Sequence, residues 1–210
     1  PGRNDLHGML VSLFHQINDH MDAQIAFSRD GLYWYRPERR AIVPVGQPGD
    51  GDEGMTYPAT TLVELPDGYW GFLCRGGSRL HNVWPDGNPD LFPKEQPPTI
   101  NWARWRPHRF CGIEAESEGG FTILTTKRTQ QQLRLNYRCE PGGWISVELN
   151  DNTPTATRPP RTGFSGFTFG ECDRVMGDSE DTVVTWGGKS DISEVGDSVA
   201  IRIKMFRAKL

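Results

Sequence analysis

The sequence lacks the features that would place it in a membrane, on nucleic acid or around a zinc ion. A mean hydropathy of −0.58 and the absence of a long apolar run exclude a transmembrane span. Lys plus Arg number 23 against 27 Asp plus Glu, a net charge of −4, so no basic field exists to hold nucleic acid or an anionic membrane. The four cysteines form no C-x-x-C pair, which argues against a zinc ribbon. We therefore expect no metal, no cofactor, no nucleic-acid partner and no membrane partner.

The sequence also lacks any mark of a particular compartment. Its first five residues contain no charged segment followed by an apolar one, so they do not resemble a signal segment. Because residue 1 is proline rather than methionine, we expect a chain that was trimmed or that begins inside a longer one. Four cysteines would allow two disulfides only in an oxidising compartment. We interpret Cys74, Cys111, Cys139 and Cys172 as small buried hydrophobic residues, and the localisation stays open.

Sustained helical periodicity is missing as well, and strand signals take its place. Glycine and proline number 24 and 16 of 210 residues, an excess that predicts many turns. Pro66-Asp67-Gly68 is typical of a hairpin turn between strands at Thr60–Leu65 and Tyr69–Cys74. Val199–Phe206 alternates apolar and charged residues, which indicates a half-buried strand of an antiparallel sheet. The sequence therefore predicts an all-β fold.

Two units are expected along the chain. Residues 82–98 are rich in proline, which predicts a long surface loop, and the strand pattern changes after Pro107. We place a boundary near Trp105–His108, so that residues 1–105 hold β-hairpins and residues 106–210 form an antiparallel β-sandwich. The other expected strands are Gly8–Ile17, Ala23–Phe27, Tyr33–Tyr35, Ile100–Arg106, Phe110–Ala115, Phe121–Thr126, Gln132–Arg138, Trp144–Leu149 and Thr182–Trp186.

One motif in the first half predicts a specific turn. Residues 28–34 read SRDGLYW, an S-x-D-G-x-x-W pattern. An aspartate at such a turn caps backbone N–H groups, and a glycine supplies a positive φ angle. We expect Asp30 to cap the backbone N–H groups, Gly31 to adopt the positive φ angle and Trp34 to pack between sheets.

A second motif, taken together with the order of segments that follows it, carries a family resemblance. Residues 52–58 read DEGMTYP, and a predicted hairpin then ends at Arg75, with His81 beyond it. With the S-x-D-G-x-x-W turn, this order resembles the late blades of the five-bladed β-propeller glycoside hydrolases, the superfamily of levanase/invertase-like and arabinanase-like enzymes. The second half resembles the β-sandwich that follows such a propeller, through residues 106–110, 125–127, 143–149, 163–165, 171–173 and 207–210.

The resemblance implies only the end of a propeller. A propeller of this kind needs about five blades, and about a blade and a half precedes the sandwich region here. The family's Asn-Asp-Pro-Asn nucleophile region and Arg-Asp-Pro stabiliser are absent from the sequence. Missing N-terminal blades of the same protein, or another copy in a homo-oligomer, would then cover the open edge of the first unit.

Two neighbouring carboxylates are the candidate catalytic residues. Glycoside hydrolysis uses two carboxyl groups about 5 Å apart for retention and about 6.5–9.5 Å apart for inversion. The resemblance puts Asp52 and Glu53 at the start of an inner strand, beside the central cleft. Neighbours on a strand face opposite ways, so a second carboxylate must come from elsewhere, and Asp22 and Asp30 are the nearest in type. The alternative is a solvated acidic turn over residues 50–54.

Four further side chains are candidates for binding sugar. Tyr57 would stack on a sugar face, and Arg75 and His81 would donate to hydroxyl groups, unless they are surface positions at a hairpin end. Trp84, in the proline-rich loop, is the best placed tryptophan for stacking. For His15, on an alternating strand, a buried and hydrogen-bonded histidine is favoured over a catalytic one.

These patterns favour a glycoside hydrolase-like protein that acts on glycosidic bonds of a carbohydrate by carboxylate acid/base chemistry. The alternative is a non-catalytic module that binds carbohydrate or serves another interaction, and a third reading is a structural oligomer. The sequence does not decide whether the chain is an enzyme, nor does it give the sugar, the linkage or the stereochemistry.

Overall fold

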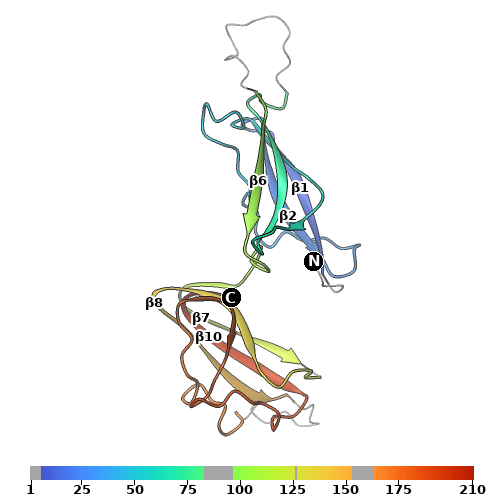
Figure 1. Cartoon of the computed structure of the whole chain (residues 1–210). Helices are drawn as coiled ribbons and strands as arrows, with labels where there is room; N and C mark the ends of the chain where they lie inside the picture. The colour runs from blue at the N-terminus through green and yellow to red at the C-terminus, as the bar shows by residue number, and fades with distance from the viewer. Residues whose placement is uncertain (1–5, 83–96, 126, 153–162) are drawn as a thin grey trace, which may run out of the picture. The chain divides into compact units, whose positions relative to one another are not determined.

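The computed structural model describes residues 6–82, 97–125, 127–152 and 163–210 (Figure 1). Strands and turns make up these residues and no helix occurs among them, so the all-β prediction is confirmed. Accordingly, this part of the chain contains no helix long and apolar enough to cross a membrane. The chain divides into two compact units, Pro1–Cys111 and Gly112–Leu210.

The first unit is built on a six-stranded sheet. Its strands follow the order β1-β2-β3-β5-β4, and β6 pairs with the other edge of β5. All pairings are antiparallel except that of β2 with β3, which meet in parallel at Met21 and Met55. The strands are β1 (His7–His15), β2 (His20–Ser28), β3 (Met55–Pro58), β4 (Val63–Glu64), β5 (Trp70–Gly77) and β6 (Thr99–Trp105).

The hairpins of this sheet follow from local sequence. Gly68 has a φ of +80° in the predicted Pro66-Asp67-Gly68 turn, and the Leu65 amide donates to the Tyr69 carbonyl at 2.7 Å. The expected strand at Tyr33–Tyr35 is wrong, because only Tyr35 pairs, in one bridge to Phe27. Most of the predicted proline-rich loop, residues 83–96, lies outside the described residues.

An aromatic cluster closes one end of the first unit. Phe72 is fully buried and stacks on Trp105 with ring centroids 5.1 Å apart, and Phe110 packs on Trp105 at 5.0 Å. Trp70 meets the ring of His108 at 4.5 Å. Because Phe110 belongs to this cluster, the first unit extends past the expected boundary at residue 105 and ends at Cys111.

The second unit is built on a four-stranded antiparallel sheet in the order β7-β10-β8-β9. The expected strands Gln132–Arg138 and Trp144–Leu149 are parts of one strand, which continues through Pro141-Gly142-Gly143. The expected strand Phe110–Ala115 is wrong for residues 110–113, and only its last two residues are in a strand, which continues through Gly119-Gly120. The strands are β7 (Glu114–Thr125), β8 (Arg134–Asp151), β9 (Asp178–Val183) and β10 (Val199–Lys209).

A wide bulge lets β8 continue through its glycines. Trp144 pairs with Phe206 and Cys139 pairs with Ala208, so residues 140–143 lie opposite Arg207 alone. Arg207 has a φ of +46°, and a Cβ added to Gly143 would lie 2.4 Å from the Arg207 carbonyl oxygen. Only glycine fits this close approach of the two backbones.

The second sheet packs one apolar face against the chain segments that connect its strands. Val199, Ile203 and Met205 of β10 are buried, as the alternating pattern predicts, whereas Arg202 and Lys204 point to solvent. The sheet residues and the covering residues form one continuous core, in a β-sandwich-like arrangement. Its members include Leu135, Tyr137, Ile145, Val147, Leu149, Phe167, Val184, Trp186, Ile192, Val195, Ile203 and Met205.

Side chains complete the hydrogen bonding of the edge of β8 that faces away from β10. The Val147 amide donates to the Cys172 sulfur at 3.2 Å, and the Trp186 indole N–H donates to the Val147 carbonyl at 2.9 Å. Both Cys172 and Trp186 are buried, and the neighbouring Ile145 and Leu149 bond backbone groups of other segments, so this edge is satisfied.

All four cysteines are free thiols. Cys74, Cys139 and Cys172 are buried as predicted, and burial raises the pKa of Cys74 to about 11 and also raises the pKa of the other two. Three of the thiols therefore stay protonated and inert near neutral pH. Cys111 is exposed, so the interpretation of this cysteine as buried is wrong. It lies at the end of the first unit, beyond the aromatic cluster.

Candidate functional site

The S-x-D-G-x-x-W motif folds into a tightly bonded turn after β2. The Asp30 carboxylate accepts the Leu32 and Tyr33 amides, each at 2.9 Å, and Gly31 has a φ of +74°. The Ser28 hydroxyl accepts the Gly31 amide at 2.8 Å. These hydrogen bonds lower the pKa of Asp30, the largest contribution coming from the Tyr33 amide. The predicted capping role of Asp30 and the predicted positive φ angle of Gly31 are thus confirmed, and the Asp30 carboxylate is used in the hydrogen bonds of the turn.

Trp34 does not pack between sheets, which corrects the expectation for the last residue of the motif. Its side chain is partly exposed, and its indole N–H donates to the Gly31 carbonyl at 3.1 Å. The motif therefore closes on itself, because its tryptophan bonds back to its own glycine.

A chain of hydrogen bonds on β1 and β2 surrounds a single carboxylate. His15 Nε2 lies 2.9 Å from Asp22 Oδ2, and Gln24 Nε2 donates to Asp22 Oδ1 at 3.2 Å. The Arg36 guanidinium in turn donates to Gln24 Oε1 at 2.7 Å. Gln24 is fully buried, and the Asp22 side chain is 16% exposed. Asp22 is therefore held in one orientation with a small part of it open to solvent.

Asp52 packs closely against the backbones of two glycines, Gly46 and Gly76. A Cβ added to Gly76 would lie 2.1 Å from Asp52 Cβ, and one added to Gly46 would lie 1.9 Å from Asp52 Oδ1. Asp52 Oδ2 lies 3.4 Å from the side-chain amide of Asn101. Asp52 Oδ1 is buried and has no hydrogen-bond partner among the described residues. A buried carboxyl oxygen without a donor is costly, so this side chain is held there by its surroundings.

The register of the sheet puts Asp22 and Asp52 on the same face. Thr56 pairs with Gly76, and the missing side chain of Gly76 points to Asp52. Met21 pairs with Met55, so the residues that follow them, Asp22 and Thr56, also share this face. We call this the polar face of the first sheet and define it by His15, Asp22, Gln24, Asp52 and Asn101.

Glu53 and Asp52 play different parts in the segment before β3. Glu53 Oε2 accepts the Gly51 amide at 2.7 Å, which closes the acidic turn. Glu53 therefore lies where the alternative interpretation of a polar turn would place it, and Asp52 extends to the sheet.

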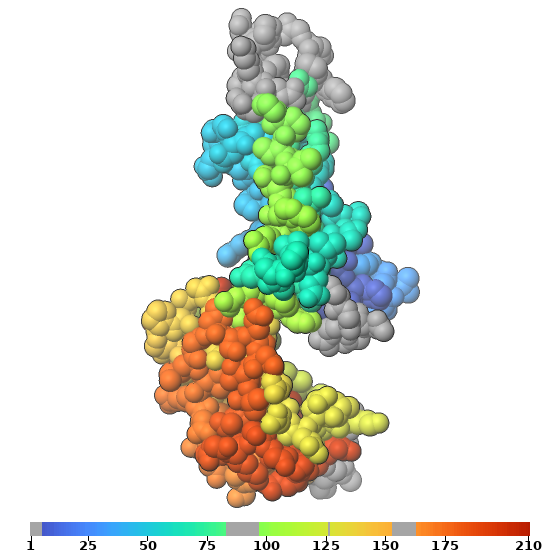
Figure 2. All heavy atoms as spheres, viewed as in Figure 1, coloured from blue at the N-terminus to red at the C-terminus, as the bar shows by residue number. Residues whose placement is uncertain are grey.

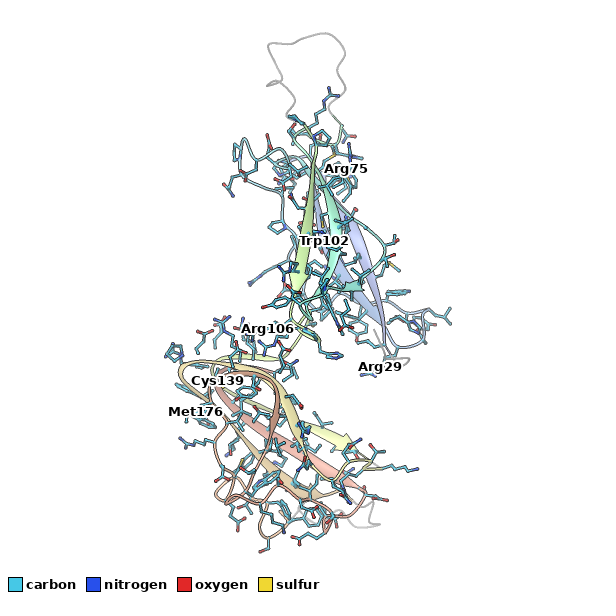
Figure 3. All side chains as sticks on the ribbon, viewed as in Figure 1. Arg29, Arg75, Trp102, Arg106, Cys139 and Met176 are labelled. Carbon is cyan, nitrogen blue, oxygen red and sulfur yellow. The ribbon has the colours of Figure 1, made fainter. Side chains whose placement is uncertain are left out.

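Tyr57 and Arg75 lie opposite each other on the other face of the sheet. They are a cross-strand pair of β3 and β5, and Arg75 also pairs with Ile100 of β6. Ile100 is 73% exposed and Trp102 is 50% exposed (Figure 3 shows Arg75 and Trp102 on adjoining strands). We call this the aromatic face and define it by Tyr57, Leu73, Arg75, Ile100 and Trp102.

His81 and Trp84 are the two remaining residues predicted to bind sugar. The His81 ring packs on Phe14 of β1 with centroids 4.9 Å apart, and its backbone amide donates to the Asp19 carbonyl at 3.0 Å. Trp84 lies outside the described residues. The candidate residues are thus spread over both faces: Asp52 on the polar face, and Tyr57 with Arg75 on the aromatic face.

Sequence reasoning did not identify the bonds that link His15, Asp22, Gln24 and Arg36. The sequence feature that could have revealed these bonds is the short connection after β1. A turn of four residues sets His15 opposite His20, and this register brings His15 near Asp22. No group of three or more metal-ligating side chains gathers anywhere in the described ranges. The polar face is therefore best described as a site of carboxylates and hydrogen-bond donors.

Comparison with protein-family models, curated proteins and solved structures finds no match for this chain. The assignment of function accordingly rests on the residues and geometry of the chain itself.

Proposed function

We propose that this chain is part of a glycoside hydrolase-like protein that acts on glycosidic bonds of a carbohydrate. The observation that carries the proposal is the placement of two carboxyl groups, Asp22 and Asp52, on one face of one sheet. They come from different strands or their flanks, so Asp22 is the second carboxylate in this proposal in place of Glu53, whose carboxylate accepts the Gly51 amide.

The two carboxylates differ in what surrounds them. Asp22 accepts hydrogen bonds on both oxygens and keeps part of its surface in solvent, as a group that must be oriented toward a substrate requires. His15 and Gln24 are its positioning residues. Asp52 carries a buried oxygen without a donor, a strained arrangement of the kind found at functional sites. In this proposal the pair carries out the acid/base chemistry, and the resemblance to propeller hydrolases points to the same reaction class.

The proposal is tested by replacing each carboxylate by its amide. Asp22→Asn and Asp52→Asn are each expected to lower the release of reducing ends from levan or arabinan by about a hundredfold to ten-thousandfold, the usual contribution of general acid–base catalysis. Glu64→Gln, which changes an exposed carboxylate of the same sheet, is the matched control and should leave the rate unchanged. Equal rates for all four proteins would remove the pair from the mechanism.

The aromatic face favours a second candidate, a non-catalytic carbohydrate-binding module. An exposed tryptophan and a half-buried tyrosine beside an arginine offer ring faces to sugar C–H groups and a donor to hydroxyl groups. In this case Trp102→Ala and Arg75→Ala weaken binding to immobilised glycans, Asp22→Asn does not, and no reducing ends appear. Leu32→Ala, an exposed apolar position on the turn after β2, serves as the control.

A further inference from the structure

The second unit has a hollow at one end of its sheet. It is lined by residues from the end of β7, from the start and the last part of β8, and from the start of β10. Its volume is about 980 Å³, at the upper end of the range for small-molecule sites. The loop between β7 and β8 forms one wall, and Asp191 and Ile192 form part of another. This loop, yellow in Figure 2, projects from the surface of the second unit.

The lining combines an aliphatic floor with an amide-rich wall. The floor is formed by side chains that belong to the core of the sandwich, including Leu133, Ile192 and Ile201. The wall carries Thr129 and a run of three glutamines, residues 130–132, all exposed. Carboxamides and hydroxyls both donate and accept hydrogen bonds, so this wall suits a ligand rich in hydroxyl groups.

The hollow also carries an excess of positive charge. Lys127, Arg128 and Arg134 line it against the single acid Asp191. Arg134 is paired with Asp181 at 2.6 Å, and the guanidinium of Arg128 donates to two backbone carbonyls of the loops. Within the described part of the chain, neither Lys127 nor Arg128 has an ion pair; Arg128 is held by the loop carbonyls and is half-buried, whereas Lys127 is exposed and is the cation that we assign to a ligand.

The acid in the hollow is already engaged. The Asp191 carboxylate accepts the Ser193 amide at 2.8 Å. This bond and the positive charges of Lys189 and Arg128 lower the pKa of Asp191, so it stays ionised near neutral pH. The net charge offered to a ligand is therefore positive.

We propose that this hollow binds an acidic oligosaccharide, with hydroxyl groups on the glutamine wall, C–H groups on the aliphatic floor and a carboxylate at Lys127. No aromatic ring lines the hollow, so recognition depends on the amides and on the charge rather than on stacking. Nine of the fourteen lining residues are polar or charged, which favours a sugar over an aliphatic acid. The inference stands on the second unit alone and does not need the carboxylates of the first.

The test titrates the full chain with trigalacturonate and with galactotriose, a neutral sugar of the same length. Trigalacturonate is expected to bind and galactotriose to bind at least about fivefold more weakly, the size of one partly exposed charge contact. Lys127→Gln should weaken trigalacturonate binding by a similar factor and leave galactotriose unchanged. Gln131→Ala should weaken both sugars.

The control is Arg138→Gln, which removes the same charge from a residue of β8 that does not line the hollow. It should leave both affinities unchanged, and thermal unfolding checks that each variant is folded. Absence of binding at millimolar trigalacturonate overturns the site. Equal affinities for the two sugars overturn the role of charge. Equal losses of trigalacturonate affinity from Lys127→Gln and Arg138→Gln overturn the site, because they show that the overall electrostatic field of the chain attracts the ligand and this hollow does not.

Discussion

The two sheets of this chain differ in what they bury. The second sheet buries an aliphatic and aromatic core that alternates cleanly with exposed charges along β10. The first sheet buries a smaller apolar core, including Ile25 and Phe72, with a larger share of polar side chains, Gln24 and Thr56 among them, and holds a carboxylate oxygen without a donor at Asp52. The buried polar residues of the second sheet are Ser146 and Asn150. Burial of polar groups costs stability, whereas burial of apolar groups provides it. The second sheet is thus built for stability, and the first keeps groups that stability alone would not select.

The largest expected effect lies in the second sheet. Ile145 is fully buried in the core of β8, so Ile145→Ala should lower the free energy of unfolding by about 2–5 kcal/mol. Ile123→Ala, at a half-exposed position of β7, should cost much less. Urea unfolding followed by tryptophan fluorescence measures both. Similar costs for the two variants would show that the sandwich core is loosely packed and would break the comparison.

A smaller effect is expected where the first sheet holds Asp52. The added methyl group of Gly76→Ala would meet Asp52 Cβ at 2.1 Å, so the carboxylate must move, at a cost of about 1–3 kcal/mol. The adjacent Gly77→Ala meets only Met55 at 3.5 Å and should be close to neutral. Urea unfolding measures the cost, and the levan and arabinan assays should show reduced activity for Gly76→Ala alone. If Gly76→Ala is fully active, the position of Asp52 does not matter to function.

The smallest effect concerns the turn after β2 and its pH dependence. The lowered pKa of Asp30 means that its ionised form stabilises the folded state above its ordinary pKa of 3.8, and this stabilisation is lost as the pH falls through the lower folded value. Asp30→Asn should therefore lower the melting temperature at neutral pH, and the difference from the native protein should shrink below pH 3.8. Glu64→Gln should show no such dependence. A melting-temperature difference for Asp30→Asn that is constant with pH would show that the substitution acts through the geometry of the turn and not through the charge of the carboxylate.

Sequence reasoning succeeded where the cause is local. The turn at Asp30 and Gly31, the hairpin turn at Gly68 and the alternation along β10 each depend on a few neighbouring residues. It failed at Gly119-Gly120, taken as a break between strands, because the pairing with β10 holds the chain extended through both glycines. Whether the hairpins of the first half are propeller blades stays a prediction.

The candidate site was only partly predictable, because its contacts join distant segments. Asp52 was a candidate from its motif, but the glycines that enclose it, Gly46 and Gly76, could not be recognised without the fold. Asp22 was named only by residue type, and its bonds to His15 and Gln24 depend on the register of β1 on β2. The register of a hairpin is set by its turn, so this information is present in the sequence but weak.

The hydrogen bonds of Cys172 and Trp186 to Val147 bear on how the protein behaves at high concentration. An open strand edge is a template on which other chains can stack into aggregates. Here a buried thiol and a buried indole bond the amide and the carbonyl of Val147, and backbone groups of other segments bond its edge neighbours Ile145 and Leu149. Loss of the Trp186 indole would leave the Val147 carbonyl without its partner on that edge, so one aromatic nitrogen helps to keep the edge closed to other chains.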